Sequence, residues 1–100
     1  MEEKDFNRSR DSCAIPVDLI KETDGTYIAK TPVISDVFAA GTTRDEALDA
    51  LCLDLIEYAK EYRDNYDLYS KAPNRKAHLP YVLKILSATL SGDARSMLRV

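Results

Sequence analysis

The stretch Gly41-Thr42-Thr43-Arg44-Asp45-Glu46-Ala47-Leu48 predicts the start of a long helix. Thr43 and Glu46 have the spacing of a capping box, in which the threonine oxygen accepts a free N–H of the first turn and the glutamate accepts the N–H of the cap residue. Apolar residues then recur at helical spacing, with no Gly or Pro between them: Leu48, Leu51, Cys52, Leu55, Ala59 and Tyr62. With Ala47, Ile56 and Tyr58 the stripe covers roughly half of the circumference. A stripe this wide requires a second layer to pack against.

The residues before this helix predict that layer. Residues 12–22 alternate in polarity, which is typical of a strand with one buried face. Asp24-Gly25 favours a tight hairpin turn, so residues 26–31 form the return strand. Residues 37–40 then form a third strand after a connection that begins at Pro32. The helix covers one face of this meander, and Ile20 and Ile28 point to the open face.

A second amphipathic helix is predicted near the end of the chain. Its stripe consists of Leu79, Val82, Leu83, Leu86 and Leu90. The helix either begins near Pro80 after a separate turn or kinks at that residue. Residues 63–72 lose the apolar stripe and are predicted to be a loop anchored by Tyr66, Leu68 and Tyr69. Leu53 and Ile85 lie outside the main stripes of their helices, which suggests a helix–helix or subunit contact.

The predicted fold class is therefore α+β: a three-stranded antiparallel β-meander followed by a long helix packed on the sheet and a second, C-terminal helix. The predicted division is a disordered tail at 1–11, a β-β-β-α domain at 12–64, a loop plus C-terminal helix at 65–91, and a tail at 92–100. The length of 100 residues suits one domain.

The composition excludes several classes of function. No apolar run approaches the roughly 20 residues of a membrane span, and no secretory signal is visible, so we expect a soluble, cytoplasmic protein. Cys13 and Cys52 have no CxxC spacing and there is no His cluster, which argues against a metal site or a disulfide framework. His78 is interpreted as a surface or capping residue, because no catalytic partner stands at motif spacing. We expect no enzyme activity and no cofactor.

The charge is distributed unevenly along the chain. Residues 43–67 contain eight acidic and three basic residues, a balance of −5, whereas residues 71–84 contain four basic residues and no acid. Such a dipolar molecule suits a charged partner or self-association. The candidate partner-binding residues are Asp36, Leu53, Asp54, Glu57 and Glu61. The candidate nucleic-acid-contacting residues are Lys71, Arg75, Lys76 and Lys84, although a solvated face or a match for a neighbour's acidic helix is the preferred interpretation.

The order of the motifs resembles that of the HicB-like antitoxins over residues 13–62, about half of the chain. The shared elements are Asp24-Gly25-Thr26-Tyr27, a proline-led connection, and Gly41-Thr42-Thr43 with Glu46-Ala47-Leu48. The resemblance implies a partly degenerate ribonuclease H-like or double-stranded-RNA-binding-like fold without catalytic carboxylates. It also implies the neutralisation of a small ribonuclease toxin. The family's usual connection is replaced here by Pro32-Val33-Ile34-Ser35-Asp36, and its C-terminal DNA-binding module is not recognisable. Residues 73–84 instead resemble the tails of short antitoxins from other toxin–antitoxin classes.

We therefore expect a small, non-catalytic antitoxin that holds a small basic toxin against its acidic helix and open sheet edge. A homo-oligomer, most simply a homodimer, is also expected. Two alternatives remain open: an orphan homo-oligomeric interaction module without a toxin, and a weak nucleic-acid-binding domain based on the basic stretch.

Overall fold

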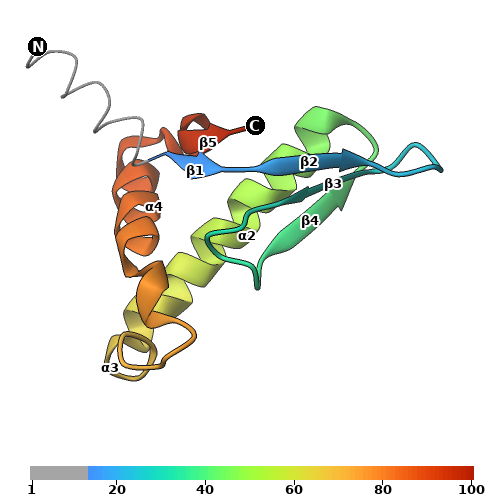
Figure 1. Cartoon of the computed structure of the whole chain (residues 1–100). Helices are drawn as coiled ribbons and strands as arrows, with labels where there is room; N and C mark the ends of the chain where they lie inside the picture. Colours follow the sequence, from blue (N-terminus) through green and yellow to red (C-terminus); the bar gives the residue numbers. More distant parts are fainter. Residues whose placement is uncertain (1–13) are drawn as a thin grey trace, which may run out of the picture.

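The computed structural model describes residues 14–100, which form a small antiparallel sheet crossed by one long helix (Figure 1). Strands β2 (Asp18–Lys21), β3 (Tyr27–Lys30) and β4 (Phe38–Gly41) are ordered β2-β3-β4. The helix α2 (Arg44–Asp64) packs on β3 and β4. The predicted α+β class and the order of these elements are confirmed. The tail predicted at 1–11, and Cys13, lie outside the described residues.

The register of the sheet explains which face α2 covers. Leu19, Ala29 and Ala39 stand opposite one another on the three strands. Ala29 and Ala39 are buried, and their small side chains let the helix approach the sheet closely. The neighbouring cross-strand row is Ile20, Ile28 and Ala40, which points to the other face because successive side chains alternate. That face is left open, as predicted.

The hairpin between β2 and β3 turns at Asp24-Gly25, as the sequence predicts. The Asp24 carboxylate accepts the N–H of Thr26 at 3.0 Å, and this hydrogen bond lowers the pKa of that carboxyl. Gly25 has a φ of 92°, in the left-handed region that a side chain disfavours.

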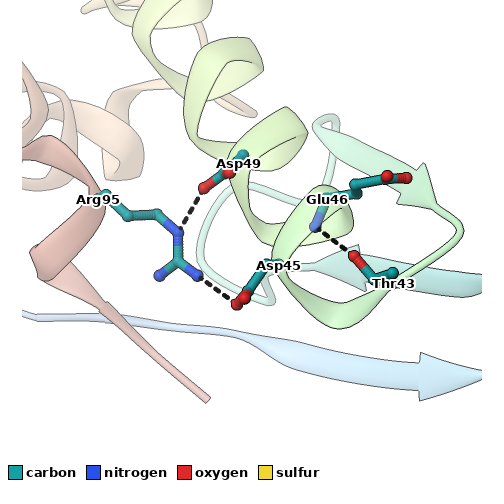
Figure 2. Close-up of polar contacts among 5 residues, drawn as sticks. All are labelled: Thr43, Asp45, Glu46, Asp49 and Arg95. Carbon is teal, nitrogen blue, oxygen red and sulfur yellow. Dashed lines mark hydrogen bonds and ion pairs between the residues drawn. The ribbon is translucent and has the colours of Figure 1, made fainter.

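The N-terminus of α2 is capped almost as predicted (Figure 2). Thr43 Oγ1 accepts the N–H of Glu46 at 3.1 Å. The Glu46 carboxylate, however, accepts the N–H of Thr42 at 3.0 Å and its hydroxyl at 2.6 Å, so it reaches one residue further back than the predicted cap N–H. These two bonds lower the pKa of Glu46. A Cβ on Gly41 would lie 2.5 Å from the Ala47 backbone nitrogen, so the entry to the helix has no room for a side chain there.

The predicted loop at 63–72 is partly helical. It contains the end of α2 and the short helix α3 (Tyr66–Tyr69), and a 3-10 turn, η1 (Lys76–His78), follows before α4 (Leu79–Ser91). Of the two alternatives at Pro80, the separate turn is the correct one, since the proline occupies the first turn of α4. Tyr66 and Leu68 are exposed and do not anchor the loop; of the predicted anchors, Tyr69 packs against the core.

The buried face of α4 agrees with the predicted stripe at Val82, Leu79 and Leu86, which are buried or packed against the core, but differs from it elsewhere. Val82, Ile85 and Ala88 are buried, whereas Leu83 is 58% and Leu90 91% exposed. Ile85, predicted to lie off the stripe, is fully buried. The physical reason is that α4 is apolar around most of its circumference, so spacing alone does not identify the face that meets α2.

The predicted tail at 92–100 is in fact folded against the core. After Gly92 ends α4, the 3-10 turn η2 (Ala94–Met97) leads into β5 (Leu98–Arg99), which pairs in parallel with β1 (Ile15–Pro16). Ala94, Met97 and Leu98 are buried, and the Val17 N–H donates to the Arg99 carbonyl at 2.7 Å. Figure 1 shows β1 and β5 side by side near the upper end of α4.

An ion-pair fork ties η2 to the first turns of α2 (Figure 2). Arg95 Nε lies 2.9 Å from Asp49 Oδ1 and a terminal nitrogen of Arg95 lies 3.6 Å from Asp45 Oδ1. All three side chains are substantially exposed, so the fork orients η2 more than it stabilises it.

Candidate functional site

A groove of about 280 Å³ lies between the start of β4 and the outer side of α2. Helix α2 contributes residues at positions i, i+3, i+4 and i+7, which share one helical face. The lining residues are Asp36, Val37, Phe38, Asp54, Glu57, Tyr58 and Glu61. The groove therefore brings together Asp36, which precedes the sheet's third strand, and three acids of the long helix. We call this feature the acidic groove.

Four of the five predicted partner-binding residues line the acidic groove. They are Asp36, Asp54, Glu57 and Glu61, and all four are exposed. The fifth, Leu53, is exposed on α2 next to Asp54 but does not line the groove. None of the seven lining residues is basic, so the carboxylates repel one another and would attract a cation.

The groove also has an apolar component that sequence reasoning did not assign to it. Phe38 is 66% exposed at its rim, although it lies on a strand. Val37 and Tyr58 are buried and form part of the wall. An exposed aromatic residue beside carboxylates combines apolar area with attraction for cations. The four residues 37–40 are all apolar, so their sequence gives no signal for which of them is exposed.

Tyr58 is held in place by His78 across the junction of α2 and η1. The Tyr58 hydroxyl lies 2.6 Å from His78 Nδ1, and the rings meet edge to face at 5.6 Å. Burial lowers the pKa of His78 and raises that of Tyr58, so at neutral pH a neutral imidazole and a neutral phenol share this hydrogen bond. The expectation of a surface His78 is wrong, because the residue is only 7% exposed. His78 does stand at the N-cap position of α4, but its side chain makes no capping hydrogen bond. The signal missed was its position four residues before Val82, in line with the buried face of α4.

The predicted nucleic-acid-contacting residues do not share one environment. Lys71 and Lys76 are exposed, Lys84 is half-buried on α4, and Arg75 is half-buried against aromatic rings. The Arg75 guanidinium carbon lies 4.3 Å from the centre of the Tyr69 ring and 5.6 Å from that of Tyr58. The Arg75 carbonyl accepts the Tyr62 hydroxyl proton at 3.1 Å. Arg75 is therefore part of a packed aromatic cluster.

Glu61 connects this aromatic cluster to the acidic groove. It lines the groove, and its carboxylate also accepts a short hydrogen bond from the Tyr69 hydroxyl. That bond raises the pKa of Tyr69 and keeps the phenol protonated. The rings of Tyr62 and Tyr69 meet edge to face, with their centres 5.6 Å apart. Glu61 therefore joins the groove to a group of aromatic residues that pack against one another.

Within residues 14–100, no group of three His, Cys, Asp or Glu side chains is arranged to hold a metal ion. In the same part of the chain, no helix is long and apolar enough to cross a membrane.

Comparisons with known proteins point to one class. The family model PHD_like, described as an antitoxin of RelE/RelB toxin–antitoxin systems, matches residues 10–100. The solved structure of an antitoxin part of a proposed toxin/antitoxin system from Syntrophomonas wolfei subsp. wolfei is 31% identical, with a TM-score of 0.79. The alignment covers 97% of this chain and 69% of that one. A search of curated proteins finds no match. These results support the predicted antitoxin class but do not identify the HicB-like family.

Proposed function

Since this chain belongs to the PHD_like family of antitoxins from RelE/RelB toxin–antitoxin systems, we propose that it binds and neutralises a small, basic ribonuclease toxin. The observation that carries this proposal is the acidic groove, which is lined by Asp36, Asp54, Glu57 and Glu61 and has the exposed Phe38 at its rim.

The chemistry of the groove fits such a partner. A ribonuclease holds its substrate largely through basic side chains that contact phosphates. A surface lined by carboxylates is complementary to those side chains and competes with RNA for them. Such complementarity speeds association and rejects partners of the wrong charge. Phe38 would supply the apolar anchor, and Leu53 would extend the contact along α2.

The role we propose is non-catalytic, in line with the antitoxin family. The protein would act where its toxin meets RNA, in the cytoplasm. The resemblance of residues 13–62 to HicB-like antitoxins remains a hypothesis about this β-β-β-α part of the chain. The boundary near residue 64 between that part and the C-terminal helix is likewise a prediction.

Co-expression with each protein encoded by a gene next to that of this chain tests the proposal. The chain should restore growth to cells that express the toxin, and the two proteins should elute as one complex. Glu57→Lys should weaken the complex by at least about 1.5 kcal/mol, roughly tenfold in Kd, as loss of a close interfacial charge pair does.

Glu22→Lys is the matched control, since Glu22 is exposed beside the hairpin turn and outside the groove. It makes the same change in net charge and should leave neutralisation and Kd nearly unchanged. Equal neutralisation by Glu57→Lys and the wild type would refute the assignment of the groove. Failure of every neighbouring protein to bind would refute the toxin-binding function.

A second candidate function is that of a homo-oligomeric interaction module without a toxin. It is favoured by the apolar residues on the surface, namely Ile20 and Phe38 on the sheet and Leu83 and Leu90 on α4. Nucleic-acid binding by Lys71, Arg75, Lys76 and Lys84 remains an untested prediction.

A further inference from the structure

Arg75 is a cation that lies against two aromatic rings, one of which lines the acidic groove. Its guanidinium lies 4.3 Å from the Tyr69 ring centre and 5.6 Å from that of Tyr58. Tyr58 lines the groove, and Tyr69 is hydrogen-bonded to Glu61, another lining residue. The chain's own guanidinium is thus seated where the acidic lining of the groove meets the aromatic cluster.

The contacts that hold the Arg75 guanidinium against the rings are weak enough for another cation to displace it. Aromatic faces attract arginine, but each such contact contributes little where water has access, and Arg75 is half-buried. Within residues 14–100, no ion pair joins Arg75 to a carboxylate. The backbone of this segment is held independently, because the Arg75 carbonyl accepts bonds from Tyr62 and from the His78 N–H. The side chain can therefore leave the rings without unfolding the turn.

We infer that Arg75 is an internal competitor: in the free chain it occupies the rings of Tyr69 and Tyr58 beside the acidic groove, a position that an arginine of the bound partner takes over. This inference rests on the proposed function and specifies the partner's chemistry as a basic segment with an arginine. Binding then requires Arg75 to leave the rings of Tyr69 and Tyr58, which lowers the affinity and rejects weakly basic partners.

The groove suits arginine better than lysine. A planar guanidinium can stack on a ring and present paired N–H donors to a carboxylate at the same time. The Tyr69 ring and the carboxylates of Glu61 and Glu57 offer both kinds of contact at the same end of α2. The ammonium group of lysine gains the charge attraction, but it can neither stack on the ring nor present paired N–H donors to a carboxylate.

A tetra-arginine peptide is a suitable probe for the full chain, with tetra-lysine as the comparison. The variant Arg75→Gln removes the competitor and keeps the backbone carbonyl. Lys76→Gln is the matched control, because it makes the same charge change at the next, exposed residue. By calorimetric titration, Arg75→Gln should bind tetra-arginine about fivefold more tightly than Lys76→Gln, which converts to about 1 kcal/mol for one cation–π contact. Tetra-lysine should not distinguish the two variants.

A measurement on the wild type makes the test independent of any variant's folding. The Arg75 side-chain Nε–H resonance, shifted by the rings in the free chain, should move toward the value of a solvent-exposed arginine when tetra-arginine binds. Bound peptide with an unmoved Arg75 resonance would overturn the inference. So would equal affinities of Arg75→Gln and Lys76→Gln, or failure of both the wild type and Arg75→Gln to bind the peptide. Toxin neutralisation that persists alongside any of these results would leave the proposed function standing.

Discussion

The assignment of Ile85 to the buried face of α4 can be tested by one pair of substitutions. Ile85 is completely buried among Val82, Ala88 and the facing side of α2, whereas Leu90 on the same helix is 91% exposed. Ile85→Ala should destabilise the chain by about 3 kcal/mol, because the deleted carbons lose their contacts and leave a cavity. In a domain of this size, 1 kcal/mol corresponds to roughly 4–8 °C, so the melting midpoint should fall by roughly 12–24 °C.

Leu90→Ala is the control for this prediction. It removes as many carbon atoms from the same helix, and alanine is at least as good a helix former as leucine. Because its side chain is in solvent, the free energy of unfolding should change by no more than about 0.5 kcal/mol. Thermal and urea unfolding, followed by circular dichroism, measure both variants.

The two variants give opposite results if the leucine stripe were the buried face. An Ile85→Ala midpoint within about 2 °C of wild type would then accompany a large loss in Leu90→Ala. That outcome would refute the packing of α4 described above. A loss in Leu90→Ala that disappears on dilution would instead place Leu90 in a contact between subunits.

Three further predictions concern the helix cap, pH and self-association. Thr43→Ala should cost about 1 kcal/mol in urea unfolding through the lost N–H acceptor, and Thr43→Ser should restore it. Burial lowers the pKa of His78 below its ordinary 6.5, so the unfolded chain binds the proton more readily and stability should fall as pH drops below about 6.5. His78→Gln should remove that part of the pH dependence, and an unchanged slope would contradict it. Light scattering at micromolar concentration should give more than a monomer mass if the open sheet face with Ile20 and Phe38 self-associates, and Phe38→Ser should then return the monomer.

The parts of the fold with a local chemical signature were predictable. The cap at Thr43 fixed the start of α2 because a threonine oxygen and a glutamate three residues later satisfy free N–H groups in one geometry. Asp24-Gly25 identified the hairpin for a similar reason. The acids of the groove were found because Asp54, Glu57 and Glu61 lie on one side of a helix whose other side is apolar. Asp36 lies in the connection before β4 and lines the same groove.

The parts that depend on distant residues were not predictable in the same way. His78 looks like a surface residue until the Tyr58 hydroxyl is placed beside it. The face of α4 is decided by contact with α2, since Leu83 and Ile85 have similar apolarity. Two-residue strands such as β5 have no periodicity to detect, and their partner is at the other end of the chain. The Glu46 carboxylate accepts from the N–H of Thr42 rather than from that of Thr43, because the hydroxyl of Thr42 adds a second donor.

The pairing of β1 with β5 has a kinetic consequence. Along the sequence, the three-stranded sheet and every helix of the described chain lie between the two strands. Closing so long a loop costs more chain entropy than closing a hairpin does. Contacts of such long range form late, after α2 and α4 supply the surface that aligns them. They are also among the first to open, by a local excursion that leaves α2 intact. The Val17 amide, bonded to the Arg99 carbonyl, should therefore exchange its hydrogen sooner than the amides in the middle of α2. A protease should likewise cleave near the opened β1–β5 pair well before it cleaves within α2.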